Sequence, residues 1–253
     1  MTLPSDPPPA RAKIQRQFLG WCVHFYTALG LVAAAAIAAL IIDGRPESFR
    51  RAFLLMVAAT LIDATDGTLA RRVRIKEVLP GFDGRRLDDL IDFLTYTCLP
   101  LLLIARAHLL PDGCAVCLLL PLLASAYGFC QVSAKTDDGY FLGFPSYWNL
   151  VAFYLYCLDL GTLAGTLIVA LFAVMVFVPI KYIYPNRTGP LRAVTLTLAI
   201  AWGVVTLVLL AALPARHPIL LAVSLSFIAY YLVASFILHA RAALKLRSYR
   251  REA

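Results

Sequence analysis

The sequence predicts an all-α integral membrane protein. Of its 253 residues, 61% are hydrophobic and only 15% are charged, a balance outside the range of ordinary soluble domains. The apolar residues gather into stretches long enough to cross a bilayer, and most basic residues lie in the connections on one side. These observations predict one membrane domain over residues 1–253, built as a bundle of about eight transmembrane helices.

Eight apolar stretches define the expected helices. They lie near 18–42, 51–70, 88–109, 114–134, 145–159, 161–183, 190–213 and 218–240. Most are long enough to cross about 30 Å of hydrocarbon at about 1.5 Å per residue. The stretch at 145–159 is short, so seven spans also fit the pattern, but eight is our prediction.

Residues 1–17 precede the first stretch and are polar and rich in proline. They do not form a secretory signal peptide, because the apolar run that follows is too long and lacks a cleavage-site pattern. The part next to the first helix fits a short amphipathic helix at the membrane surface or an unordered tail, and both interpretations remain open.

The distribution of basic residues predicts the orientation. With an even number of spans both termini lie on one side, which then holds 18 of the 23 Lys and Arg residues, against 5 on the other. By the positive-inside rule the termini are therefore cytoplasmic. The net charge of +8 fits attraction to anionic membrane lipids rather than to nucleic acid, since no stretch interleaves basic and aromatic residues.

The most informative feature is a motif of eight fixed positions on the second and third expected helices. It reads Asp63-x-x-Asp66-Gly67-x-x-Ala70-Arg71, then twelve residues, then Gly84-x-x-x-Asp88-x-x-x-Asp92. Spacings of three and four place the carboxylates of each helix on one face. A carboxylate within a membrane is costly without a partner, and oxygen-only ligands favour a hard cation such as Mg²⁺ or Mn²⁺. We therefore expect the four carboxylates to converge on a divalent metal site at the cytoplasmic end of these two helices.

The other motif positions suit a phosphorylated ligand. Gly67 and Gly84 lack side chains, which would let a nucleobase or sugar approach the backbone closely. Ala70 is small, and Arg71 offers a forked set of donors suited to phosphate oxygens. The motif thus predicts a site for a metal and a nucleotide together.

The motif resembles the signature of the CDP-alcohol phosphotransferases, D-x-x-D-G-x-x-A-R, a spacer, and G-x-x-x-D-x-x-x-D. The spacer has twelve residues rather than the eight of most members, and this length, the flanking residues 76–80 and 86–89, and the stretch 135–145 are similar to the bacterial phosphatidylcholine synthases. The resemblance implies a multi-pass homodimer of the bacterial inner membrane. It also implies that CDP-diacylglycerol and choline are converted to phosphatidylcholine and CMP.

The resemblance also implies roles for the motif residues. Asp63, Asp66 and Asp88 would be metal ligands, and Asp92 would be both a ligand and the general base that activates the choline hydroxyl. The CDP moiety would be bordered by Asp63, Asp66, Gly67, Ala70, Arg71 and Gly84. By contrast, Asp83 and Asp89 lie outside the signature, and we expect them to cap or flank a helix.

Aromatic residues are the expected binders of choline, because a quaternary ammonium is attracted to aromatic faces beside negative charge. The segment 126–156 supplies aromatic side chains together with the two carboxylates of Asp137 and Asp138. The candidates are Tyr127, Tyr140, Tyr147, Trp148 and Tyr154. Tyrosine and tryptophan also form the aromatic belt at a membrane interface, so a packing role is the competing interpretation.

Three further alternatives remain open. The same chemistry could use serine, glycerol 3-phosphate or inositol phosphate as the acceptor alcohol. A cation transporter would also place carboxylates in a membrane, but it has no need of Gly67, Ala70 and Arg71. The pair Gly161-x-x-x-Gly165 could pack two helices of a dimer, or it could make a contact within one chain.

Overall fold

The computed structural model describes residues 10–111, 113–132, 140–183 and 192–252, so the candidates Asp137 and Asp138 lie outside the described residues. The elements, in chain order, are α1 (Ala10–Asp43), α2 (Pro46–Val73), α3 (Ile75–Val78), α4 (Gly84–Asp92), the π-helix η1 (Phe93–Cys98), α5 (Leu99–Arg106), the 3₁₀-helix η2 (Cys114–Leu118), α6 (Leu119–Cys130), β1 (Tyr140–Leu142), α7 (Trp148–Leu158), α8 (Thr162–Phe177), β2 (Lys181–Ile183), α9 (Arg192–Ala212) and α10 (Pro218–Glu252). Residues 10–17, expected as a separate surface helix or a tail, are the first turns of α1.

The chain is an α-helical membrane protein, as the sequence predicts. Four segments of the described chain, one each in α1, α2, α9 and α10, are long and apolar enough to cross a membrane. Shorter apolar helices occupy 116–130, 148–158 and 162–177. The third expected stretch folds as α4, η1 and α5, which follow one another without interruption.

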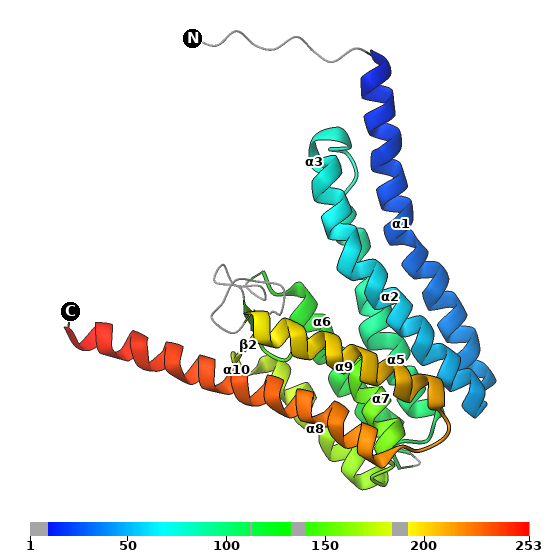
Figure 1. Ribbon diagram of the computed structural model, residues 1–253, viewed down its shortest axis with the longest axis vertical. Helices are drawn as coiled ribbons and strands as arrows, with labels where there is room; N and C mark the ends of the chain where they lie inside the picture. Colours follow the sequence, from blue (N-terminus) through cyan, green and yellow to red (C-terminus); the bar gives the residue numbers. More distant parts are fainter. Residues whose placement is uncertain (1–9, 112, 133–139, 184–191, 253) are drawn as a thin grey trace.

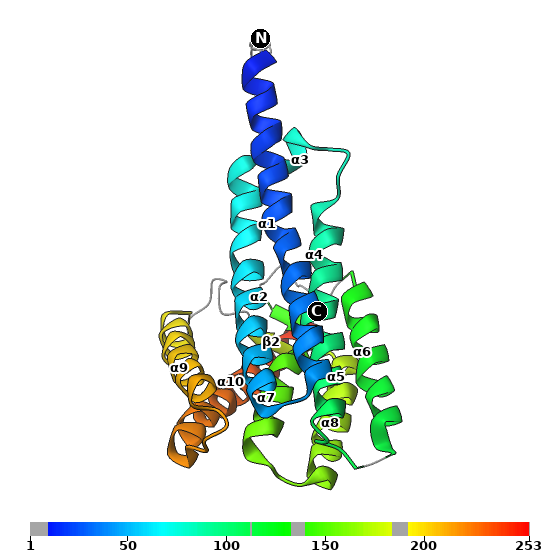
Figure 2. The same ribbon diagram turned by 90° about the vertical axis from the view of Figure 1, so that its right-hand side faces the viewer.

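The two longest apolar segments at the N-terminal end form a helical hairpin. Helices α1 and α2 pack along each other, and α1 also contacts α4 (Figures 1 and 2). The turn between them contains Gly44 at φ +71°, where a Cβ would lie 2.2 Å from Nη2 of Arg106. Glycine is therefore required here both by the backbone conformation and by the guanidinium packed against it.

The connection from α2 to α4 ends with the cap expected from the sequence. The Asp83 carboxylate accepts hydrogen bonds from the backbone N–H groups of Arg85 and Arg86, at 3.2 and 3.3 Å. These bonds satisfy donors that the first turn of a helix leaves unpaired. The cap fixes the point at which α4 begins, one turn before Asp88.

The remaining helices form the other part of the bundle. Helix α6 packs on α8, and α9 packs on α10; in Figure 1 the α9–α10 pair runs across the direction of α1 and α2. The short strands β1 and β2 pair antiparallel, with Phe141 opposite Tyr182. They tie the α6–α7 connection to the one that follows α8.

Helices α7, α9 and α10 are joined by a network of neutral polar side chains. The Tyr154 hydroxyl lies 2.6 Å from Ser224 Oγ and accepts a 2.8 Å hydrogen bond from Trp202 Nε1. Ser224 Oγ also lies 3.3 Å from Thr206 Oγ1. We call these four residues the hydroxyl network; such bonds hold membrane helices together because lipid offers the polar groups no other partner.

Candidate active site

Three of the four motif carboxylates meet between α2 and α4. Asp63, Asp88 and Asp92 each offer one oxygen, and these three oxygens all lie within 4.8 Å of one another. All three residues are half-buried. Asp88 and Asp92 lie one turn apart on α4, and α2 brings Asp63 to the same face from the other side.

Asp66 is placed differently. Its side chain is only 5% exposed, and its Oδ2 accepts a 2.8 Å hydrogen bond from Thr27 Oγ1 of α1. Three residues of an α-helix correspond to a rotation of about 300°, so Asp63 and Asp66 point about 60° apart. That difference lets one carboxylate face α4 while the other faces α1.

The two motif glycines have different surroundings. A Cβ at Gly67 would meet only Arg71 Nη1, at the ordinary contact distance of 3.4 Å. A Cβ at Gly84 would lie 2.4 Å from Cε1 of His24, which no real contact allows. Gly84 is therefore demanded by packing within the protein, whereas nothing among the described residues requires glycine at position 67.

His24 contacts the motif at Gly84, although nothing in the sequence assigns it to the site. It is 5% exposed, its ring centroid lies 4.3 Å from that of Phe82, and its Nε2 has no hydrogen-bond partner among the described residues. Because His24 and Thr27 lie one turn apart on α1, this helix touches both halves of the motif. Sequence spacing gives no sign of this contact, since it joins residues sixty positions apart.

Arg71 lies at the open side of α2. The side chain is exposed, and its Nη2 donates a 2.9 Å hydrogen bond to Thr68 Oγ1. The guanidinium thus stays beside Gly67, with Ala70 half-buried on the same turn. This arrangement leaves a cationic group and a bare stretch of helix next to each other, which suits a phosphate bound near the backbone.

Tyr96 is a third residue outside the motif that contacts it, after Thr27 and His24. Its hydroxyl donates a 2.8 Å hydrogen bond to Oδ2 of Asp63. Tyr96 comes four residues after Asp92, a spacing that places it near the acidic face, but its contact with Asp63 depends on how the helices pack and has no signal in the sequence.

The five aromatic candidates are spread over the α6–α7 region. Trp148 is fully buried, and its Nε1 donates to Ser125 Oγ at 2.7 Å; Tyr154 belongs to the hydroxyl network. Tyr127 is 46% exposed and lies against Phe177, with ring centroids 5.0 Å apart.

The two remaining candidates lie near β1. Tyr147 is half-buried beside Phe144, with ring centroids 6.4 Å apart. The ammonium of Lys181 lies over the Tyr140 ring, 5.3 Å from the ring centroid. A cation therefore already sits on one of the five rings.

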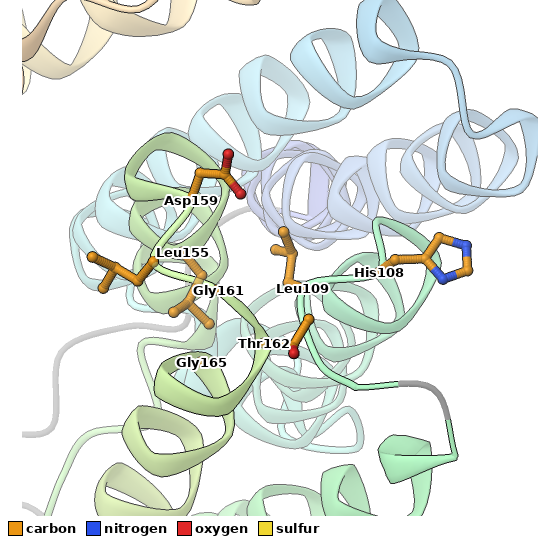
Figure 3. A pocket seen from close by; sticks show the side chains of 8 residues that line it. His108, Leu109, Leu155, Asp159, Gly161, Thr162 and Gly165 are labelled. Atoms are coloured by element: carbon orange, nitrogen blue, oxygen red, sulfur yellow. The ribbon is translucent and has the colours of Figure 1, made fainter.

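A small cavity lies far from the acidic residues, between the ends of α5 and α7 and the start of α8 (Figure 3). The cavity lies beyond the far end of η1 and α5 from Asp92, and the His108 ring points away from the other lining side chains. Gly165 packs against Leu109 here, where a Cβ would lie 2.6 Å from the backbone oxygen. Gly165 thus makes a contact within one chain.

Comparison with known proteins identifies the family. No family model matches the chain. A phosphatidylcholine synthase of Legionella pneumophila is 34% identical over 232 residues, which cover 88% of this chain and 89% of the relative. The chain belongs to the phosphatidylcholine synthase family. Further members are the phosphatidylcholine synthases of Pseudomonas aeruginosa, 35% identical over 83% of this chain and 88% of the relative, and of Bradyrhizobium diazoefficiens, 38% identical over 73% and 68%.

Membership of the phosphatidylcholine synthase family makes the protein a phosphatidyltransferase of phospholipid biosynthesis, built on membrane helices. The donor set at its acidic cluster fits a divalent cation. Two oxygens bound to one Mg²⁺ or Mn²⁺ at about 2.1 Å each lie at most about 4.2 Å apart. Oxygens already within 4.8 Å of one another therefore need only small side-chain shifts to share an ion.

Proposed function

We propose that the protein transfers the phosphatidyl group of CDP-diacylglycerol to choline, forming phosphatidylcholine and CMP. The observation that carries the proposal is the convergence of Asp63, Asp88 and Asp92, in a chain whose relatives are phosphatidylcholine synthases. A half-buried cluster of carboxylates is suited to holding a cation beside a diphosphate.

Asp63, Asp66, Asp88 and Asp92 would hold Mg²⁺ or Mn²⁺. The bound cation would neutralise charge on the diphosphate and on the departing CMP. Asp66 accepts from Thr27 through Oδ2, and its Oδ1 would be the atom that binds the metal. Arg71 would contact phosphate oxygens while Gly67, Ala70 and Gly84 border the CDP moiety.

Asp92 would act as the general base. Its carboxylate takes the proton of the choline hydroxyl, and the oxygen forms a bond to the phosphorus that carries diacylglycerol. The bond from that phosphorus to the oxygen shared with CMP breaks, and CMP leaves with the electron pair. Asp92 suits this task because it lies one turn beyond Asp88 on the acidic face, at the end of α4, and a base must lie within hydrogen-bond reach of the proton it takes.

Choline would be held by aromatic faces from the set Tyr127, Tyr140, Tyr147, Trp148 and Tyr154. The Lys181 ammonium at 5.3 Å from the Tyr140 centroid supports this assignment, because it shows that ring accepting a cation. A choline ammonium in the same position would displace Lys181 from the ring face.

We further propose eight spans in one domain, with both termini and the acidic motif on the cytoplasmic side of a bacterial inner membrane. The excess of Lys and Arg on the side of the termini supports this orientation. It places the site where soluble choline reaches it, while the diacylglycerol chains stay in the bilayer. The family resemblance supports a homodimer.

The test is CMP release by detergent-purified protein given CDP-diacylglycerol and Mn²⁺, with choline, serine, inositol phosphate or glycerol 3-phosphate as acceptor. We expect release with choline alone, lost on addition of EDTA and in Asp92→Asn. The matched control is Asp89→Asn, which removes a carboxylate from the same helix outside the motif and should stay active. Release with another acceptor instead would retain the transferase and overturn choline as its substrate. Full activity in EDTA would overturn the metal site.

A further inference from the structure

Tyr96 contacts the acidic cluster from within the membrane domain. The 2.8 Å hydrogen bond from its phenol to Asp63 Oδ2 joins η1 to α2, two segments 33 residues apart in the chain. The side chain is half-buried, so the bond is shielded from competing water. Neutral donors that bind a metal-ligating carboxylate fix its orientation and tune its affinity for the ion.

The π-helix explains how Tyr96 reaches this position. In a straight α-helix a residue eight positions after Asp88 would point about 80° away from it. Helix η1 covers Phe93–Cys98. A π-helix has more residues per turn than an α-helix, so each residue rotates the chain by a smaller angle about the axis. The side chain of Tyr96 is thereby brought back toward the face that carries Asp88 and Asp92.

We propose that Tyr96 is a positioning residue of the metal site: its hydroxyl orients the Asp63 carboxylate toward Asp88 and Asp92. This inference rests on the proposed metal-dependent function. Its consequence is that removing one phenolic oxygen weakens the binding of the cation, although Tyr96 itself does not bind the ion.

The chain offers a matched control. The Tyr26 hydroxyl lies 2.8 Å from Thr65 Oγ1 and also joins two helices at the same part of the bundle. Tyr26→Phe removes an interhelical hydroxyl whose partner is a threonine, whereas Tyr96→Phe removes one whose partner is a carboxylate. Any effect common to both variants is therefore one of helix packing.

The experiment measures Mn²⁺ binding directly, by the loss of the electron paramagnetic resonance signal of free Mn²⁺ in titrations of full-length protein. The Mn²⁺ concentration for half-maximal CMP release, measured in washed membranes without purification, is the second measurement. We expect Tyr96→Phe to weaken Mn²⁺ binding by about 10- to 100-fold, with Tyr26→Phe unchanged. The KM for choline should change much less than the Mn²⁺ requirement.

A third variant separates positioning from space filling. Phenylalanine fills the space of Tyr96 better than histidine does, but only histidine keeps a ring N–H donor. The proposal therefore expects Tyr96→His to bind Mn²⁺ more tightly than Tyr96→Phe; the opposite order, or wild-type binding by Tyr96→Phe, would overturn it. Failure of the wild-type protein to bind Mn²⁺ would instead overturn the proposed metal site, and the role of Tyr96 with it.

Discussion

The acidic cluster and the hydroxyl network both place polar side chains between membrane helices, but they differ in charge. In the network, Tyr154, Trp202, Thr206 and Ser224 are neutral and serve one another as hydrogen-bond partners. In the cluster, the carboxyl groups of Asp63, Asp88 and Asp92 place oxygens within 4.8 Å of one another. Neutral groups that satisfy one another are stabilising, whereas like charges held together repel unless a cation joins them.

This difference in charge distinguishes a candidate ligand site, the acidic cluster, from a structural contact, the hydroxyl network. The network is complete as it stands, so its role is to hold α7, α9 and α10 together. The cluster brings three carboxylate oxygens close together, an arrangement suited to a bound cation. The proposed ion would account for the cluster, whereas helix packing accounts for the network, so variants of the two regions should separate activity from stability.

The largest effect is expected from Asp88→Asn. Activity should fall by about 100-fold or more, since a ligand matters more than the outer partners whose loss costs about 10- to 100-fold. The rise in unfolding temperature on adding Mn²⁺ should also be smaller than in wild type, because one proposed ligand is missing. Activity and thermal unfolding, each measured with and without Mn²⁺, check both parts. An equal rise in wild type and Asp88→Asn would show that Asp88 does not bind the ion.

The next effect is expected from Gly84→Ala. The new methyl group would overlap the His24 ring, whose Cε1 lies 2.4 Å from the Cβ position, and overpacking of this kind costs about 1–3 kcal/mol. We expect lower stability and lower activity together, both partly restored by adding His24→Ala. Gly67→Ala is the contrast, because it has room to fold normally and should raise only the KM for CDP-diacylglycerol. Equal loss of stability in the two alanine variants would contradict this account.

A smaller effect is expected from Thr27→Val. The substitution keeps the shape and removes the donor that binds Asp66, leaving a buried carboxylate short of one hydrogen bond. We expect activity to fall by about tenfold, with Thr27→Ser close to wild type because the hydroxyl is retained. Steady-state rates over a range of Mn²⁺ concentrations test this, and equal rates for the valine and serine variants would show that the bond is dispensable.

The smallest effect on activity is expected from Ser224→Ala in the hydroxyl network. The variant loses the bonds to Tyr154 and Thr206, worth about 0.6 kcal/mol each in membrane proteins. The unfolding temperature should fall slightly, while the kcat and the requirement for Mn²⁺ stay within twofold of wild type. A marked change in the requirement for Mn²⁺ would show that the hydroxyl network influences the acidic cluster and is more than a packing contact.

Much of this arrangement could be predicted from the sequence, because it depends on local periodicity. Helical spacing placed Asp88 and Asp92 on one face, and the position of Asp83 before α4 predicted its cap. Contacts between distant segments could not be predicted in this way. The contacts of His24 with Gly84, Thr27 with Asp66 and Tyr96 with Asp63 depend on the rotation and depth of packed helices, and the π-turn that aims Tyr96 has no periodic signal.

The position of α1 bears on how the protein is made. Its membrane segment has a mean hydropathy of 2.3, against 1.5 for that of α2, which carries Asp63 and Asp66. Since synthesis runs from the N-terminus, α1 enters the bilayer first and already holds the hydroxyl that Asp66 requires. When α2 follows, Asp66 therefore meets a hydrogen-bond partner already in the bilayer, and the order of the chain eases the insertion of the helix that carries half of the candidate site.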